Sequence, residues 1–275
     1  MQPENTLARL RVVLVAPRNP LNIGAAARAL SNFGCADLRL VHPYDPSFRE
    51  ARSAVNAADL LANAQVHATL AEAVAGCTLV VGTTAVGARE VLHPLHALPL
   101  AAPLLLRAME TAPAALLFGS EKTGLTKADL SHCHWLLRIP TLMENYSMNL
   151  GQAVAVCLYA LATASASPYA PAGAMGVRDA MATTADVPGA AQALPRLPLA
   201  QEELERLLSV LMDVLHQSQR RRMQSDERYA EHLRRLLLRL NPGRRDTQIL
   251  LGILRRVLWR LQAKESDNTK HDGSV

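Results

Sequence analysis

The chain has 275 residues, of which 49% are hydrophobic, and carries a formal net charge of +5. This length and composition predict a globular protein with a large domain and a smaller one, and no apolar run is long enough to span a bilayer. The first residues, MQPEN, lack the basic and apolar regions of a secretory signal. We therefore expect a cytoplasmic protein.

The four cysteines predict no disulfide framework and no metal site. Cys35, Cys77, Cys133 and Cys157 are scattered and show no CxxC spacing, which favours reduced, buried thiols. The run 132–134 reads His-Cys-His, but adjacent side chains on one element cannot all face one ion. We expect no metal.

Strand and helix signals alternate through the first part of the chain. Short apolar runs predict strands at residues 11–16, 37–41, 65–68, 78–82, 114–118 and 135–139. Helices are predicted between them at residues 21–33, 53–64, 70–75, 101–111 and 127–131. This alternation predicts an α/β fold with a mostly parallel sheet flanked by helices.

The composition changes after this α/β domain, which we place at residues 1–165. Residues 166–198 are rich in Ala, Pro, Gly and Ser and predict a flexible linker. Helical periodicity returns at residues 199–264, and the polar residues 265–275 predict a disordered tail.

The positive charge belongs to the C-terminal helical region. Residues 200–264 hold 14 Lys or Arg and 8 Asp or Glu, whereas the rest of the chain holds 15 and 16. A basic region suggests a polyanionic partner such as RNA. It is equally typical of a well-solvated helix surface, and charge alone does not decide between the two.

The most informative motif is NIGAAAR at residues 22–28, which follows the first strand after a break at Pro17, Asn19 and Pro20. Six residues turn a continuous helix by about 600°, so Asn22 and Arg28 would stand about 120° apart. Both can line one cleft only if Asn22 lies in the turn before the helix. The alternative is a helix-capping Asn22, a packing Gly24 and a surface Arg28.

Two further motifs favour a shared cleft over this alternative. They are LLFGSEKTGL at residues 116–125 and IPTLMENYSMNL at residues 139–150. In order and spacing, the three motifs resemble the signatures of the SPOUT (TrmH-type) RNA 2′-O-methyltransferases, and most of all the TrmJ branch. The resemblance covers residues 11–164. It implies a deep C-terminal trefoil knot, S-adenosyl-L-methionine as cofactor, tRNA as partner and a homodimer. The implied reaction is methylation of the ribose of the first anticodon-loop nucleotide, a cytidine or uridine.

The resemblance also implies the site residues. The implied catalytic residues are Arg28, Asn22, Glu121, Ser147 and Asn149. The implied cofactor-binding residues are Thr83, Thr84, Gly119, Glu121, Ile139, Leu142, Ser147 and Met148. The implied RNA contacts are Arg28, Arg89, Arg220, Arg221 and Arg222, and the helical region adds Arg234 and Arg235 as candidates.

Chemistry favours some of these roles over others. A guanidinium hardly loses its proton, so Arg28 is better suited to grip a phosphate beside the target ribose than to act as a base. Glu121 could fix a loop by accepting backbone N–H bonds, and Asn149 could equally cap the helix that follows it. Arg89 departs from the compact spacing of the TrmJ branch, and a solvated loop arginine is its alternative.

Glycines and one tyrosine complete the candidates. Gly82 and Gly119 would let the backbone approach the cofactor closely, although glycine is also common in ordinary strand-end turns. Tyr146 would stack on the cofactor or a base, or simply pack against the protein.

Other functions remain open at this point. A ribosomal RNA methyltransferase is less favoured, because no N-terminal substrate-binding domain fits before residue 11. A non-catalytic RNA-binding protein is disfavoured by the intact motifs, and a dinucleotide oxidoreductase by the lack of GxGxxG after the first strand. For a homodimer, we expect the small-residue helices at 21–33 and 153–161 to form the interface, with Arg28 facing the partner's cofactor loop.

Overall fold

A computed structural model describes residues 6–44, 48–49, 51–85, 93–142, 147–166, 199–218 and 226–271. Within these residues a single sheet has the strand order β3-β2-β1-β6-β4-β7-β5, and each neighbouring pair is parallel. The strands are β1 (Leu10–Val15), β2 (Asp37–Val41), β3 (Gln65–His67), β4 (Leu79–Thr83), β5 (Leu95–Ala97), β6 (Ala114–Phe118) and β7 (Trp135–Arg138). The predicted α/β class with a mostly parallel sheet is confirmed, whereas the knot stays a prediction.

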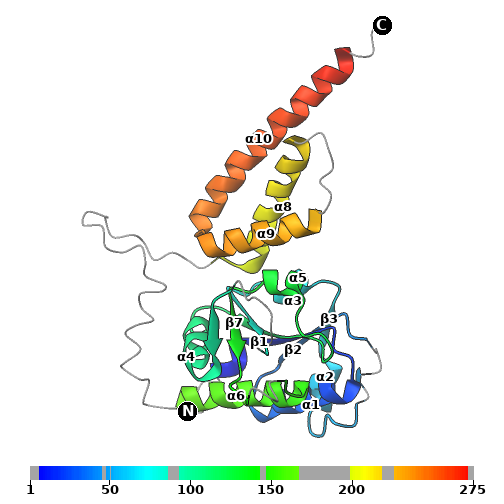
Figure 1. Ribbon diagram of the computed structural model, residues 1–275, viewed down its shortest axis with the longest axis vertical. Coiled ribbons are helices and arrows are strands. Elements are labelled where there is room, and N and C mark those ends of the chain that lie inside the picture. Colours follow the sequence, from blue (N-terminus) through cyan, green and yellow to red (C-terminus); the bar gives the residue numbers. More distant parts are fainter. Residues whose placement is uncertain are drawn as a thin grey trace, which may run out of the picture.

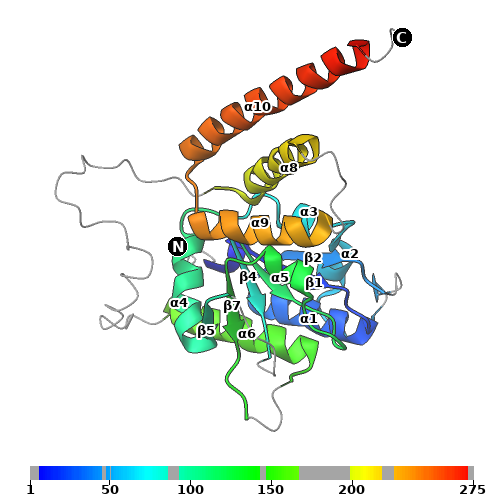
Figure 2. The same cartoon turned by 45° about the horizontal axis from the view of Figure 1, so that its top comes forward.

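Helices cover both faces of the sheet (Figures 1 and 2). One face packs against α1 (Pro20–Asn32), α4 (Leu98–Met109) and α6 (Leu150–Ala166). The other face carries α3 (Leu70–Val74) and α5 (Lys127–Ser131). The short helices η1 (Thr6–Arg9) and α2 (Ala58–Ala62) complete this part of the chain.

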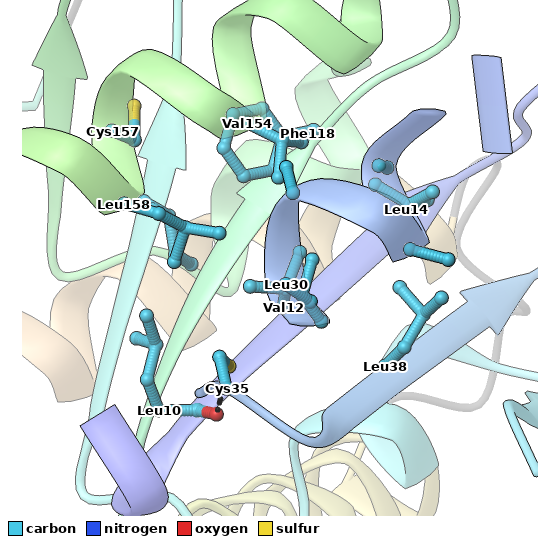
Figure 3. Packing of buried hydrophobic residues seen from close by; sticks show 14 of the residues in the cluster. Leu10, Val12, Leu14, Leu30, Cys35, Leu38, Phe118, Val154, Cys157 and Leu158 are labelled. Carbon is cyan, nitrogen blue, oxygen red and sulfur yellow. Dashed lines mark hydrogen bonds between the residues drawn. The ribbon is translucent and has the colours of Figure 1, made fainter. Parts of the chain in front are cut away.

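The two-sided burial follows from the alternation of side chains along the central strands. In β1, Val12 and Leu14 face the α1–α6 side, and Val13 and Val15 face the α3 side. Figure 3 shows the first of these cores, where Val12 and Leu14 lie among side chains from α1, β6 and α6. Because both faces are apolar, the strand reads as a continuous hydrophobic run.

Three C-terminal helices stack beyond α3 and α5 (Figure 1). They are α8 (Gln201–Ser218), α9 (Asp226–Leu240) and α10 (Arg244–His271), held together by a small leucine core around Leu207 and Leu237. The backbone N–H of Gln201 donates to the Cys77 carbonyl at 3.0 Å, which joins the start of α8 to the segment between α3 and β4. None of the helices in the described ranges is both long and apolar enough to cross a membrane.

The structure differs from the sequence prediction in four places. Strand β5 was not predicted, and α4 begins at Leu98 rather than residue 101. The helix expected at 53–64 is wrong except for α2, because Asn56 has a φ of 59°, which a right-handed helix cannot continue. The last helix continues to His271, past the expected end at residue 264. Of the predicted linker, residues 167–198 lie outside the described residues.

Candidate active site

The candidate site lies where the carboxyl ends of β1 and β6 meet. These strands are parallel neighbours in the middle of the sheet. The chain after β1 turns into α1, and the chain after β6 forms the loop at residues 119–126. The start of α6 joins them, because α6 packs beside α1. Parallel α/β sheets place ligand sites at this edge.

A chain of side-chain hydrogen bonds connects the three sequence motifs. The Nδ2 atom of Asn149 donates to Oδ1 of Asn22 at 2.8 Å. The Nδ2 atom of Asn22 then donates to Oε1 of Glu121 at 2.9 Å. Asn22 uses both ends of its amide and therefore fixes the other two residues relative to each other, although they come from different segments of the chain.

Glu121 fastens the start of α1 to the loop after β6. Its Oε2 accepts from the backbone N–H of Arg18 at 2.8 Å, and its Oε1 accepts from that of Asn19 at 3.1 Å. Partial burial by itself would raise the pKa of the carboxyl, but the hydrogen bonds from Asn22 and the backbone outweigh it and hold the pKa below its usual range. At neutral pH Glu121 is thus an ionised anchor.

Two asparagines cap the helices of the site. Asn19 is the N-cap of α1, where its Oδ1 accepts from the Leu21 N–H at 2.9 Å, and Pro20 is the first helical residue. Asn149 caps α6 by accepting from the N–H of Gly151 at 3.0 Å. The alternative in which Asn22 caps α1 is therefore wrong, whereas Asn149 combines its cap with the hydrogen bond to Asn22.

Arg28 is not joined to this hydrogen-bond chain. Asn22 lies in the first turn of α1 and not in the turn before it, so the condition for Asn22 and Arg28 to line one cleft on the same helix face is not met. Arg28 and Ser147 are exposed, and neither side chain has a hydrogen bond or ion pair within the described part of the chain. The structure thus brings Asn22, Glu121 and Asn149 together. The side chains of Arg28 and Ser147 stay available for contacts outside the described part of this chain.

The candidate cofactor residues lie at the ends of neighbouring strands. The Thr83 hydroxyl donates to the Leu117 carbonyl at 2.8 Å, and the Thr84 N–H donates to the Leu137 carbonyl at 2.9 Å. These bonds fasten the end of β4 to β6 and β7. Beyond β7, Ile139 is half-buried and Leu142 is 80% exposed. Met148 is also half-buried.

The glycines serve the packing of the protein itself. A Cβ on Gly119 would lie 2.1 Å from the backbone carbon of Gly124, so the loop can fold back on itself only with glycine at 119. A Cβ on Gly82 would meet the side chains of Cys133 and Leu136 within 3 Å. The packing of the protein therefore requires glycine at both positions, and the approach of their backbone to a cofactor stays a prediction.

Comparison with known proteins identifies the family. The sequence profile of the SpoU rRNA Methylase family matches residues 9–159, more than half of the chain. The chain belongs to the SpoU methylase family. A relative from Sodalis glossinidius, named tRNA (cytidine/uridine-2'-O-)-methyltransferase TrmJ, is 33% identical over 249 residues, which cover 90% of this chain and 91% of the relative.

Further relatives match over almost the whole length. A Yersinia enterocolitica protein with the same name is 32% identical and covers 97% of this chain and 99% of its own. The crystal structure of TrmJ from Z. mobilis ZM4 superposes with a TM-score of 0.69 at 30% identity, over 90% of this chain and 98% of that one. The similarity to these SpoU methylases therefore includes the C-terminal helices.

Two of the basic residues assigned to an RNA surface bind other parts of this SpoU methylase instead. Arg234 binds Glu205 with two bonds of 2.6 and 3.0 Å and also donates to the Ser131 hydroxyl at 3.0 Å. Arg235 donates to the Lys127 carbonyl at 3.3 Å. These two arginines hold the C-terminal helices against α5, so their assignment to an RNA surface is corrected. Other candidates, Arg89, Tyr146, Arg220, Arg221 and Arg222, lie outside the described residues.

The His-Cys-His run is divided among separate partners. The Nδ1 atom of His132 lies 3.5 Å from Glu205, and that of His134 accepts from the Val80 N–H at 3.1 Å. Burial lowers the pKa of each imidazole to about 4, so both are neutral. Across the described ranges no three potential metal ligands gather in one place.

Sequence reasoning missed two residues of the site, Arg18 and Asn19, which contribute their backbone N–H groups to Glu121. The signal was present for Asn19, because an Asn directly before Pro predicts the start of a helix. Nothing in the sequence singled out the backbone of Arg18.

Proposed function

We propose that this SpoU methylase is an S-adenosyl-L-methionine-dependent tRNA methyltransferase. Its target is the ribose 2′-hydroxyl of the first anticodon-loop nucleotide, a cytidine or uridine. The observation that carries the proposal is the hydrogen-bond chain from Asn149 through Asn22 to Glu121, in which the three motifs converge on one edge of the sheet. Relatives that match over nearly the full length support tRNA as the substrate.

The residues at this edge suit the cofactor. The highly exposed Leu142 and half-buried Ile139 offer an apolar surface to an adenine ring, beyond the end of β7. When bound, S-adenosyl-L-methionine supplies an electrophilic methyl group. Thr83, Thr84, Gly119, Glu121, Ile139, Leu142, Ser147 and Met148 would hold it.

The protein's part in the reaction is to position and to stabilise charge. The free guanidinium of Arg28 suits a bidentate contact with the phosphate beside the target ribose. Its charge also favours the negative charge that develops on the 2′-oxygen as the proton passes to solvent water. Glu121, with its lowered pKa, fixes α1 and takes no proton at neutral pH. Ser147 orients the ribose or Arg28.

A homodimer completes this site. Arg28 and Ser147 find no partner in the described part of their own chain, which is expected if the second protomer supplies one. The outer faces of α1 and α6 suit the interface, because Leu21 is 55% exposed and Tyr159, which contacts Phe33 edge-on, is 60% exposed. The deep knot, the domain limits at 165 and 198, and a cytoplasmic location belong to the same proposal.

Ribosomal RNA is the alternative substrate, because the family profile is named for it. Transfer RNA is preferred, since a relative with a tRNA name matches 97% of this chain, a span that includes the C-terminal region. Mapping 2′-O-methyl groups in total tRNA and ribosomal RNA, with and without this protein, separates the two. A site that appears only in ribosomal RNA would contradict the tRNA proposal.

Substitution of Arg28 tests the mechanism. Arg28→Ala is expected to abolish methyl transfer and to leave S-adenosylhomocysteine binding within about twofold in calorimetry, because the cofactor residues are elsewhere. Arg28→Lys should rescue little, since lysine makes no planar bidentate contact. In mixtures, Arg28→Ala and Leu142→Asp protomers should regain activity as heterodimers. Full activity of Arg28→Ala, or of a monomer, would overturn the shared site.

A further inference from the structure

We propose that Arg18 and Tyr44 form a stacking platform for an unpaired base of the RNA, beside the candidate active site. The inference rests on the proposed function, because it takes RNA as the substrate. It concerns two residues that neither the motifs nor the hydrogen-bond chain described above assigns to the substrate.

The platform is built where the loops after β1 and β2 meet. The Ala16 N–H donates to the Val41 carbonyl at 2.8 Å, and the Tyr44 N–H donates to the Pro17 carbonyl at 3.0 Å. These backbone bonds fix the two loops to each other. The guanidinium carbon of Arg18 then lies 4.7 Å from the centre of the Tyr44 ring.

Both loops begin with backbone strain. Ala16 and His42 are the first residues after β1 and β2, and each has a φ of 47°, in the left-handed region that residues with a Cβ rarely adopt. Such conformations persist only where surrounding contacts impose them, and they concentrate at functional sites. Here they turn both chains sharply at the sheet edge and so bring Arg18 and Tyr44 together.

The platform is open to solvent and joined to the site. Tyr44 is 72% exposed, although the ring of a tyrosine is usually more buried. Arg18 presents its side chain to Tyr44 while its backbone N–H donates to Glu121 at 2.8 Å. One residue therefore connects the exposed ring to the carboxylate that organises the site.

The chemistry of the pair favours a single-stranded nucleic acid. Unpaired RNA bases bind proteins by stacking on aromatic rings and guanidinium planes, and phosphates bind arginine. Tyr44 offers the ring and Arg18 the charge, on the edge of the sheet where the target ribose is expected. Anticodon-loop bases are unpaired and can reach such a platform without melting a helix. The platform therefore holds a base next to the methylated nucleotide.

Variants of Tyr44 in the full chain test the platform. Tyr44→Ala should raise KM for an unmodified tRNA transcript and weaken tRNA binding about tenfold, with kcat within about twofold. Tyr44→Phe keeps the ring and should behave as the wild type. Arg107→Ala is the control for Arg18→Ala, because Arg107 is exposed on α4, near the opposite end of the sheet. Of these two arginine variants, only Arg18→Ala should weaken tRNA binding.

The outcomes separate the platform from the proposed function. If the wild type methylates tRNA and Tyr44→Ala has unchanged KM and affinity, the platform is refuted and the function stands. If Tyr44→Ala loses S-adenosylhomocysteine binding as strongly as tRNA binding, Tyr44 is structural and the platform is again refuted. If the wild type neither binds nor methylates tRNA, the proposed function fails, and the platform fails with it.

Discussion

Asn22→Asp provides the sharpest test of the hydrogen-bond chain. The substitution preserves the size of the side chain and the oxygen that accepts from Asn149. It replaces the amide group that donates to Glu121 with a second carboxylate oxygen. Two negative charges then face each other across a contact that measures 2.9 Å in the native chain.

The size of the effect follows from this distance. Two unit charges at 2.9 Å repel by about 1.4 kcal/mol in bulk water and by about 6 kcal/mol at an effective dielectric constant of 20. Because Glu121 is exposed, the lower value applies. The lost hydrogen bond adds about 1 kcal/mol. We therefore expect a loss of about 2–3 kcal/mol in the free energy of unfolding at pH 8.

The loss should depend on pH with a defined sign. Repulsion raises the pKa of one carboxyl of the pair in the folded state above its value in the unfolded chain. The folded variant then holds the shared proton to higher pH, so its stability is recovered at low pH and falls as pH rises. In the wild type Glu121 has a lowered pKa, and its contribution changes in the opposite direction, being lost as pH falls.

Urea unfolding of both proteins at pH 5 and pH 8 measures this difference. Asn22→Asp combined with Glu121→Gln removes the repulsion and should regain part of the lost stability. Asn32→Asp places the same charge near the other end of α1 and should show little of this pH dependence. Equal loss at both pH values, or no regain in the double variant, would refute the reasoning.

Three further predictions concern stability. Gly119→Ala should lower the free energy of unfolding by about 3 kcal/mol or more, because the new Cβ meets the backbone of Gly124. Gly252→Ala, in the open interior of α10, should raise it by up to about 1 kcal/mol. Thermal melts of both variants check this, and equal shifts in melting temperature would contradict it. Burial, aided by Arg234, lowers the pKa of His132 to about 4. The free energy of unfolding of the wild type should therefore fall by about 2 kcal/mol between pH 7 and pH 5, relative to that of His132→Gln. Urea unfolding measures this difference, and parallel pH profiles of the two proteins would argue against it. Arg234→Ala leaves Glu205 partly buried and without its arginine partner, so the free energy of unfolding should fall by about 3 kcal/mol. Hydrogen exchange in α8 and α9 should become faster. Unchanged exchange would show that this contact does not hold the helices.

The sequence predicted the sheet well because its strands are simple hydrophobic runs. Val12 to Val15 are buried on both faces, so every residue is apolar and the run is conspicuous. β5 was missed because it has three residues, pairs only with β7 and lies at the edge of the sheet, where no such pattern is required. The order of the strands depends on contacts between distant segments, which periodicity does not contain.

The sequence predicted which residues belong to the site better than it predicted how they are arranged. Asn22, Glu121 and Asn149 were selected through the resemblance, and the hydrogen bonds that join them follow only from the way β1 and β6 lie side by side. Arg234 was misassigned because charge alone does not reveal a partner. Its carboxylate, Glu205, is 29 residues away and meets it only when α9 packs beside α8.

The strand order also determines when each strand can pair with its neighbours during synthesis. β1 pairs with β2 on one side, but its other partner is β6, whose residues leave the ribosome about a hundred positions later. At about 5–20 residues per second, the apolar edge of β1 waits on the order of ten seconds for its neighbour. Asn22 waits longer still, because Asn149 is 127 residues away. A nascent chain that stops before β6 therefore exposes an aggregation-prone strand edge, and we expect protection by a chaperone to matter most in that interval.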